Sequence, residues 1–416
     1  MIRSSGRPVL RSSPAERSSV RKTGMNDLIA ALGAELAELQ ALGRLRTRPV
    51  IDGPDDRVIA LRGPGGRKVL INWASNDYLG LSQELTVING ARKALRGCGA
   101  GAGAARLLGG GLALHRRLEE GVARFFGTED CLLTTTGFQA NQAALVSLAS
   151  DPEDVLIIDR LCHASTYDGA RLAAGTLLRF RHNDIEDLER HLERTVGNRR
   201  RIVCVESIYS MDGDEAPLAA IAAACTRQGA ILVVDEAHAL GVVGPGGRGL
   251  CADLGVVPDV LVATCSKSLG SQGGLIAGAQ PIVDICVNRG RSFLFSTAPV
   301  PAAVGAAEAA LRRLRERPEM PEHLRIAAAG LRAALRAQGW QVPEGRSPII
   351  PVIVGDEQRT LELAARLREL GHFAPPIRPP TVPEGSCRLR LTVTLAHRPK
   401  DLRQLVAAMA KLRPVT

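Results

Sequence analysis

Short apolar runs alternate with alanine-rich segments between about residues 90 and 280. The runs are rich in Val, Ile and Leu, and each has the length of a single strand: residues 131–136, 154–159, 176–180, 201–207, 230–236, 259–265 and 274–279. Strands that are apolar along their whole length are typical of a parallel sheet with helices on both faces. The pattern therefore predicts a large α/β domain with a mostly parallel sheet.

The chain on either side of this region has a different pattern. Residues 26–45 carry leucines at helical spacing, and residues 58–73 are typical of a hairpin around Gly63–Gly66. A long helical stretch is interrupted near Pro318–Pro321, and residues 349–394 then indicate a small α+β unit with a proline-rich loop. We therefore expect a leader (1–24), an N-terminal helix and hairpin segment (25–75), a large domain (76–304) and a small C-terminal α+β domain (305–416).

The leader is basic and serine-rich. It contains six Arg and Lys residues but only one acidic residue, Glu16, and it has no apolar periodicity. We therefore expect it to be disordered. It is either the product of an over-long start, with Met25 opening the first helix, or a transit peptide. In both interpretations it lies outside the fold.

Composition narrows the possible partners. The formal net charge of +10 suits an anionic substrate, such as a phosphorylated carrier or an acidic protein. Nucleic-acid binding is not expected, because only 3% of residues are aromatic and no stacking motif occurs. No apolar run reaches the ~18–20 residues of a membrane helix, so no membrane association is expected. The nine cysteines are scattered without CxxC spacing, which favours a cytoplasmic setting and argues against a zinc site.

A lysine stands at the end of one buried run. Lys267 follows residues 259–265 by two positions and precedes glycine-rich chain. Burying an ammonium group is costly unless it is compensated or its charge is given up. A lysine with a depressed pKa can form an imine with an aldehyde.

Other polar residues follow the ends of the remaining strands. Gly137 opens a helix whose free N–H groups suit a phosphate, and Thr264 offers a hydroxyl nearby. Asp235 closes an apolar strand, where a protonated ring nitrogen would balance its charge. His163 and Ser210 follow two further strands. Because ligands of such sheets bind beyond the carboxyl ends of the strands, these residues together with Lys267 predict a pyridoxal-phosphate site.

Two other motifs suggest different functions. DEAH at residues 235–238 occurs in some helicases, but these need a GxxxxGK[ST] loop, which the sequence lacks. GAGAGA at residues 99–104 resembles a dinucleotide fingerprint, but it follows a helical stretch rather than a strand. A nucleotide-driven motor is therefore disfavoured.

Several longer runs together resemble the α-oxoamine synthases. They are NDYLGL (76–81), GAGAARLLGGGLALHRRLEE (101–120), TTTGFQANQAAL (134–145), HAS (163–165), SMDGD (210–214), DEAHALGVVGPGGRG (235–249), SKSLG (266–270) and RSFLFSTA (291–298). The resemblance covers roughly residues 40–412. It implies a fold-type I pyridoxal-phosphate transferase that joins an amino acid to an acyl thioester and releases carbon dioxide.

The resemblance also implies roles for individual residues. Lys267 would be the Schiff-base lysine, with Asp235 at the pyridine nitrogen and His163 stacked on the ring. The other cofactor contacts would be Ser210 and His238 near the phenolic oxygen, and Gly137, Phe138 and Thr264 at the phosphate. The substrate contacts would be Arg378 and Asn76 at the carboxylate and Thr381 in the substrate pocket.

The run IRPPTVPEGSCRLRLTVTLAH (377–397) resembles the branch of the family that joins L-alanine to a pimeloyl thioester in biotin biosynthesis. The alternative is a sister enzyme that uses glycine, serine or another acyl thioester. The resemblance further implies a homodimer with active sites at the subunit interface, and Arg44 or Arg46 near the acyl chain. The carrier is either coenzyme A or an acyl-carrier protein. Ala105 and the SKSLG run depart from the residues that many members have there.

Overall fold

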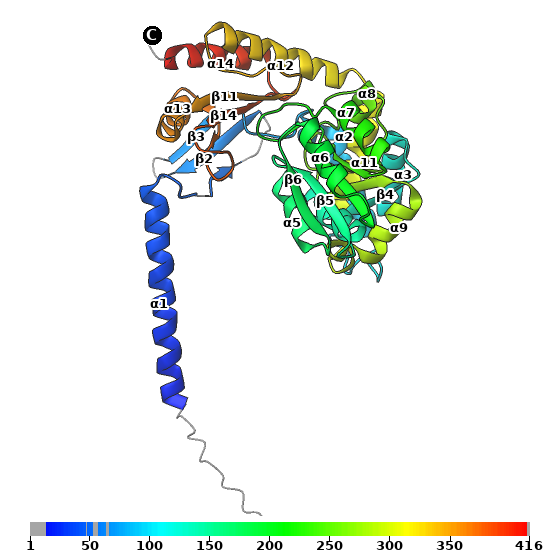
Figure 1. Cartoon of the computed structure of the whole chain (residues 1–416). Coiled ribbons are helices and arrows are strands. Elements are labelled where there is room, and N and C mark those ends of the chain that lie inside the picture. The colour runs from blue at the N-terminus through cyan, green and yellow to red at the C-terminus, as the bar shows by residue number, and fades with distance from the viewer. Residues whose placement is uncertain (1–13, 47, 53–56, 64–65, 414–416) are drawn as a thin grey trace, which may run out of the picture.

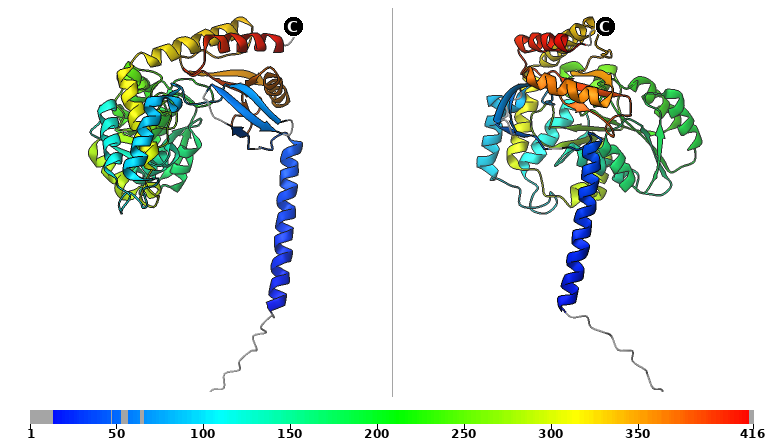
Figure 2. Two further views of the ribbon diagram at one scale, coloured as in Figure 1. Left: turned by 180° about the vertical axis from the view of Figure 1, so that it is seen from behind. Right: turned by 90° about the vertical axis from the view of Figure 1, so that its left-hand side faces the viewer.

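The protein consists of a large domain, a smaller domain and one projecting helix (Figure 1). The computed structural model describes residues 14–46, 48–52, 57–63 and 66–413. Helix α1 (Pro14–Ala41) projects away from both domains in Figure 1 and in the left view of Figure 2. Among the described residues, no helix combines the length and the apolar character needed to cross a membrane.

The large domain is built on a seven-stranded sheet with the order β4-β10-β9-β8-β7-β5-β6. Its strands are β4 (Asp130–Thr134), β5 (Asp154–Asp159), β6 (Thr176–Phe180), β7 (Arg200–Glu206), β8 (Ile231–Asp235), β9 (Val260–Thr264) and β10 (Gly274–Gly278). Only β10 runs antiparallel to its neighbours, so the other six strands end at the same edge. The predicted mostly parallel sheet is confirmed, because each of the seven apolar runs forms one of these strands.

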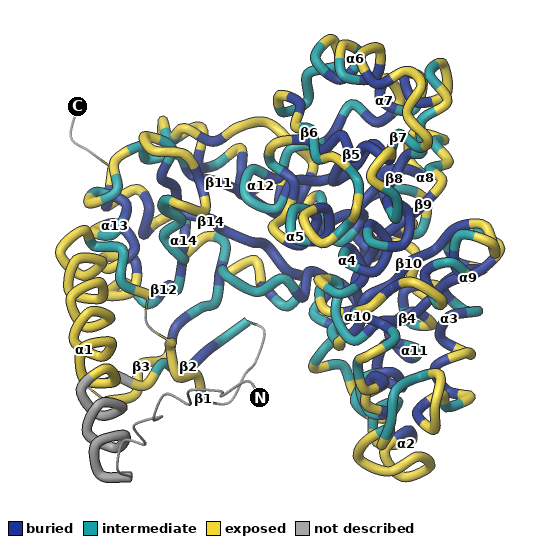
Figure 3. The backbone as a smooth tube through the Cα atoms, turned by 60° about the horizontal axis from the view of Figure 1, so that its bottom comes forward, coloured by how far each residue is buried: buried dark blue, intermediate teal, exposed yellow. Residues whose placement is uncertain are grey.

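Helices cover both faces of this sheet. Every residue of β4, β5, β9 and β10 is buried, as the dark tube in Figure 3 shows. The helices of the large domain are α2 (Leu85–Cys98), α3 (Ala113–Phe126), α4 (Gly137–Leu148), α5 (Ala164–Leu172), α6 (Ile185–Arg194), α7 (Leu218–Gln228), α8 (Leu250–Leu254), α9 (Gln280–Arg289), α10 (Arg291–Leu294) and α11 (Pro301–Glu316), with the short 3₁₀ turns η1 (Leu81–Gln83) and η2 (Pro245–Gly247).

The expected domain boundary at residue 304 falls inside α11, and this helix packs on α2. Gly90 of α2 and Gly305 of α11 meet so closely that a Cβ on either would lie 2.5 Å from the other's carbonyl oxygen. Helix α11 therefore packs on the large domain, and α12 (Met320–Ala337) carries the chain across to the small domain (Figure 1). Helical periodicity alone could not reveal which domain α11 joins.

The small domain contains two sheets. One has the antiparallel order β11 (Ile349–Gly355), β14 (Cys387–Thr392), β13 (Pro376–Ile377), and helices α13 (Glu357–Glu369) and α14 (Pro399–Leu412) pack nearby. The other has the order β1 (Val50–Asp52), β2 (Val58–Gly63), β3 (Gly66–Asn72), β12 (His372–Phe373). Because β12 pairs with β3, the N-terminal hairpin belongs to the small domain.

Helix α1 begins inside the stretch that was expected to be disordered. It starts at Pro14, a residue that suits the first helical position because its missing N–H has no partner there anyway. The structure describes residues 14–24 as the first turns of α1, although the sequence there has no regular apolar stripe. Residues 1–13 of the expected leader lie outside the described residues.

Candidate active site

A cavity of ≈ 240 Å³ opens at the carboxyl ends of the central strands. Seven of the site residues predicted from the sequence line this cavity: Gly137, Phe138, His163, Asp235, His238, Thr264 and Lys267. Asp235 and Thr264 are the last residues of β8 and β9, and the others come from the segments that follow β4, β5, β8 and β9, four strands that end at the same edge of the sheet. The topology therefore brings together side chains that are more than a hundred residues apart in the sequence.

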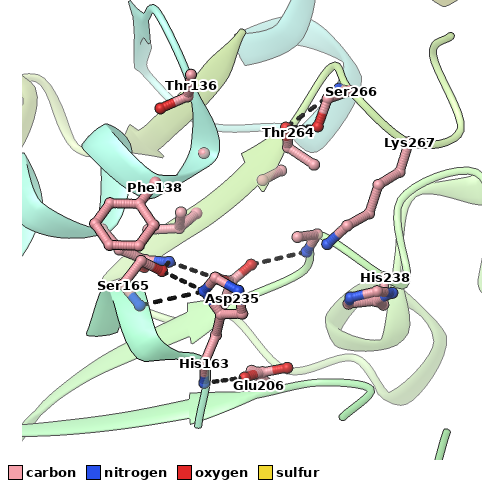
Figure 4. Close-up of a pocket in the computed structure, with 15 residues that line it drawn as sticks. Thr136, Phe138, His163, Ser165, Glu206, Asp235, His238, Thr264, Ser266 and Lys267 are labelled. Atoms are coloured by element: carbon pink, nitrogen blue, oxygen red, sulfur yellow. Dashed lines mark hydrogen bonds between the residues drawn. The ribbon is translucent and has the colours of Figure 1, made fainter. Parts of the chain in front are cut away.

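Lys267 follows β9 and extends across the cavity toward the side where Asp235 and His163 lie (Figure 4). Burial lowers its pKa from the usual value, and the nearby carboxylates of Asp235 and Glu206 only partly oppose this effect. An amine whose protonated form is disfavoured is more often available as a nucleophile. The surroundings of Lys267 thus suit imine chemistry.

Asp235 ends β8 and is fixed at the cavity wall by two hydrogen bonds. Asn141 of α4 donates to Oδ2 at 2.7 Å, and the N–H of Ala237 donates to Oδ1 at 2.9 Å. Asp235 is only 8% exposed. Each carboxylate oxygen has a second lone pair, so this group can also accept a hydrogen bond from a ligand. Sequence analysis missed Asn141, which is recognisable only from this contact.

His163 caps the N-terminus of α5 beside Asp235. Its Nδ1 lies 2.8 Å from Ser165 Oγ and also accepts the N–H of Ser165 at 3.2 Å. Ser165 in turn accepts a hydrogen bond from Asn141 at 3.0 Å. The imidazole is therefore held at one angle over the cavity, where it can stack on a flat ligand.

The first turn of α4 forms the other end of the cavity. Thr136 caps this helix by accepting the N–H of Gln139 at 3.2 Å, so the helix N-terminus is aimed at the ligand space. A Cβ on Gly137 would lie 3.2 Å from Cβ of Thr264, whose hydroxyl is 2.8 Å from that of Ser266. Helix N–H groups and two hydroxyls together form a suitable anion cradle.

A chain of contacts leads from His238 to the small domain. Tyr78 Oη lies 2.6 Å from Nδ1 of His238 and 3.3 Å from Oδ1 of Asn76. Arg390 of β14 lies 3.3 Å from the same Asn76 oxygen and donates to the carbonyl of Ser210 at 2.7 Å. Burial raises the pKa of Tyr78 to about 12, so the phenol keeps its proton. Asn76 and Ser210 therefore lie behind the cavity wall, next to a buried arginine that sequence analysis missed.

Glu206 is a second missed residue. It ends β7 in register with Asp235 on β8, lines the cavity and is only 2% exposed. Its carboxylate accepts the N–H of His163, and burial raises its pKa well above the usual value. Only the cross-strand pairing shows that this residue of the apolar run 201–207 faces the cavity.

Arg378 and Thr381 do not line the cavity. Arg378 donates to the carbonyl of Gly43, and Thr381 Oγ1 accepts a hydrogen bond from Arg46 at 3.0 Å. Arg44 pairs with Glu357 and Glu384, each at 3.5 Å. The proline-rich loop and both candidate acyl-chain arginines thus lie against each other, and their substrate roles remain predictions.

The DEAH run has a structural explanation. Asp235 and His238 face the cavity, while the buried Glu236 accepts the N–H groups of Leu250 at 3.0 Å and Cys251 at 2.7 Å at the start of α8. Ser207 also donates to Glu236 at 2.8 Å. Within the part of the chain that the structure describes, no group of His, Cys, Asp or Glu side chains is arranged to hold a metal ion.

Comparisons with known proteins agree with this arrangement. The model of the family "Aminotransferase class I and II" matches residues 68–409, and the chain belongs to this family. It is 43% identical over 385 residues to an 8-amino-7-oxononanoate synthase of Anaeromyxobacter dehalogenans, covering 92% of this chain and 95% of that protein. The corresponding enzyme of Geobacter sulfurreducens is 39% identical over 388 residues, covering 92% and 97%.

A solved structure of serine palmitoyltransferase (SPT) with pyridoxal phosphate superimposes with a TM-score of 0.86 at 30% identity, covering 92% of this chain and 96% of that chain. The resemblance to the α-oxoamine synthases and the fold-type I architecture predicted from the sequence are thus confirmed. Membership of this family also excludes the nucleotide-driven motor.

Proposed function

We propose that the protein is an 8-amino-7-oxononanoate synthase, which joins L-alanine to a pimeloyl thioester and releases carbon dioxide and the free thiol carrier in biotin biosynthesis. Relatives that bear this name share about 40% identity with nearly the whole chain. The observation that carries the proposal is the placement of Lys267, Asp235 and His163 around one cavity. A pyridoxal-phosphate enzyme, predicted from the sequence, agrees with the family and with the SPT structure.

The cavity fits this cofactor. Gly137 leaves room where a Cβ would crowd Thr264, and the start of α4 with the hydroxyls of Thr264 and Ser266 would hold the phosphate. Asp235 would accept the pyridinium N–H and keep that proton in place. His163 would stack on the ring. His238 would lie near the phenolic oxygen, as predicted.

The bound cofactor supplies an electron sink for the electrons released at the Cα of the amino acid. Lys267 would be linked to the cofactor at rest. Once the amino group of the substrate has displaced it, its neutral amine would accept the Cα proton at Nζ, because its lowered pKa makes that form available. Asp235 would hold the ring proton during this step. The reaction forms a C–C bond to the acyl carbon, expels the thiol and releases carbon dioxide.

The contact between Asn76 and Arg390 bears on the substrate carboxylate. The sequence paired Asn76 with Arg378, yet the structure puts Asn76 beside Arg390, which is close enough to lower the pKa of Lys267. We therefore add Arg390 as a candidate for the carboxylate contact, since a guanidinium can bind a carboxylate with two parallel hydrogen bonds. Arg378 stays a candidate for the carboxylate contact, and Thr381 stays a candidate for the substrate pocket.

The finer points of the proposal concern assembly and location. A homodimer agrees with the exposed apolar side chains of α1, a helix that Figure 2 shows projecting from the small domain; they are Met25, Leu28, Ile29, Leu32, Leu36 and Leu39. A cytoplasmic location agrees with the scattered cysteines, which lack CxxC spacing. The basic charge suits either coenzyme A or an acyl-carrier protein as carrier of the acyl group.

A spectral titration tests the proposed function. Purified protein reconstituted with pyridoxal phosphate should absorb visible light, and L-alanine should change the spectrum at lower concentration than glycine or serine. L-Alanine with a pimeloyl thioester should then yield 8-amino-7-oxononanoate. The likeness to SPT makes serine with a longer acyl thioester the second candidate. A stronger response to serine, with no pimeloyl product, would replace the first proposal with the second.

A further inference from the structure

His182 forms a charged cluster outside the cavity. It follows β6, and its ring lies between two carboxylates from different segments. Nδ1 lies 3.0 and 3.1 Å from the two oxygens of Asp159, at the end of β5. Nε2 lies 2.8 Å from Oδ2 of Asp214, in the loop between β7 and α7. Asp159 has no exposed surface, and the His182 side chain is 18% exposed.

This geometry favours the imidazolium form. A neutral imidazole carries one N–H, so one of its nitrogens would present a lone pair to a carboxylate oxygen. The Asn183 amide lies 3.3 Å from Nε2, but it is closer to Asp214, at 3.0 Å. Burial lowers the pKa of His182, but the hydrogen bonds and charges of both carboxylates outweigh it and raise the pKa to about 9.

The groups facing His182 come from every neighbouring segment. Asp159 and Asp214 supply the charges, and the ring of Tyr209 meets the imidazole edge-on with centroids 4.4 Å apart. The N–H of Asn183, a residue at φ 54°, donates to Asp159 at 2.8 Å. Two acids and one imidazolium thus lie next to the buried phenol of Tyr209, and Cys162 and Glu206 are the further titratable groups that interact with Asp159 or Tyr209.

Both carboxylates stand at the base of a loop that serves the cavity. Asp159 accepts the N–H of Leu161 at 2.8 Å, and this loop ends at His163. The carbonyl of Asp214 accepts the N–H of Tyr209 at 3.0 Å, next to Ser210. His182 is therefore the charged link between the two loops, and it is not among the residues that line the cavity.

We infer that His182 is a positioning residue: as an imidazolium it ties the loop that ends at His163 to the loop that carries Ser210. This link fixes the distance between His163, which is proposed to stack on the cofactor ring, and Ser210, which is proposed to lie near its phenolic oxygen. The inference rests on the proposed cofactor site, and it does not depend on which amino acid or acyl thioester is used.

The test measures the dissociation constant of pyridoxal phosphate by equilibrium dialysis, from neutral to alkaline pH, together with the circular dichroism of the bound cofactor. In the wild-type protein, the affinity for pyridoxal phosphate should fall as the pH rises through about 9. The pKa of His182 is raised in the folded protein, so its imidazolium stabilises the structure below that pH, and this stabilisation is lost above it. His182→Gln should weaken binding by roughly tenfold already at neutral pH, since the buried carboxylate of Asp159 and the half-buried one of Asp214 lose their cation.

Asp214→Asn provides the sharper comparison. The new side-chain amide at position 214 could donate to Nε2 of a neutral His182, while Nδ1–H of His182 still donates to Asp159. The link between the two loops would then no longer need a charged imidazolium. This variant should keep neutral-pH affinity and lose the alkaline fall. His323→Gln, at an exposed position of α12, is the matched control and should behave as wild type.

Wild-type affinity and pH profile in His182→Gln, or an unchanged alkaline fall in Asp214→Asn, would overturn the inference. The readout needs neither L-alanine nor a thioester. A wild-type protein that binds the cofactor normally but makes another product would therefore contradict only the proposed substrates.

Discussion

Lys267 and Asp235 show how position in a strand sets the chemistry of a side chain. Each lies at or just beyond the end of a buried strand, so each is half in the core and half in the cavity. Strand-end positions were readable from the sequence, because an apolar run that ends in a polar residue marks them. Asn141, Glu206 and Arg390 were missed because their roles appear only in contacts between elements.

Lys267→Ala should abolish turnover, because no other amine lines the cavity among the described residues. Borohydride reduction of the wild-type holoenzyme, followed by peptide mass spectrometry, should place the cofactor on Lys267. Lys400→Ala, on the exposed start of α14, should leave both results unchanged. An adduct on a different lysine would refute the assignment.

Asp235→Asn should lower turnover by roughly 100-fold or more while cofactor binding is partly retained, because the neutral amide no longer stabilises a pyridinium. Steady-state kinetics and a cofactor titration on the same preparation separate the two effects. Full turnover in this variant would show that the ring nitrogen is held by another group.

At the scale of elements, contacts between helices position the strands that carry the site. The close meeting of Gly90 and Gly305 lets α2 and α11 approach backbone to backbone. Periodicity identified the helical stretches, but it gave no information on which helices touch. The expected domain boundary at residue 304 therefore fell inside α11.

Gly90→Ala should destabilise the protein by about 1–3 kcal/mol, because the new methyl group would overlap the carbonyl of Gly305 and push the helices apart. Gly330→Ala is the control: it lies inside α12 with nothing near its Cβ position, so it should be neutral or stabilising by up to about 1 kcal/mol. Chemical denaturation measures both. Equal stability of the two variants would mean that the α2–α11 contact is looser than described.

At the scale of the whole molecule, the contacts within one chain do not explain why α1 exposes its apolar side chains. It projects from the small domain with a stripe of exposed Leu and Ile, although such side chains are stabilised by burial (Figure 2). A second copy of the chain, as proposed for the homodimer, would cover this stripe.

Replacing both Leu32 and Leu36 with Glu should shift the protein from dimer toward monomer, since burying two carboxylates in an apolar contact is costly. Analytical ultracentrifugation over a range of concentrations measures the shift. The control replaces Glu35 and Glu38 of the same helix with Gln, which should leave the assembly unchanged. Dimers of undiminished stability in the leucine variant would mean that α1 does not contribute to the subunit contact.

The sequence by itself determined the sheet, the strand-end residues and the family, because apolar runs and turn residues act over a few neighbouring positions. Only the tertiary structure decided that Asn76 meets Arg390, that Arg378 lies outside the cavity and that His182 joins two loops. These contacts link residues far apart in the chain, and their partners are set by how strands order and domains pack. A pattern over a few neighbouring residues carries no information about which distant residues will meet.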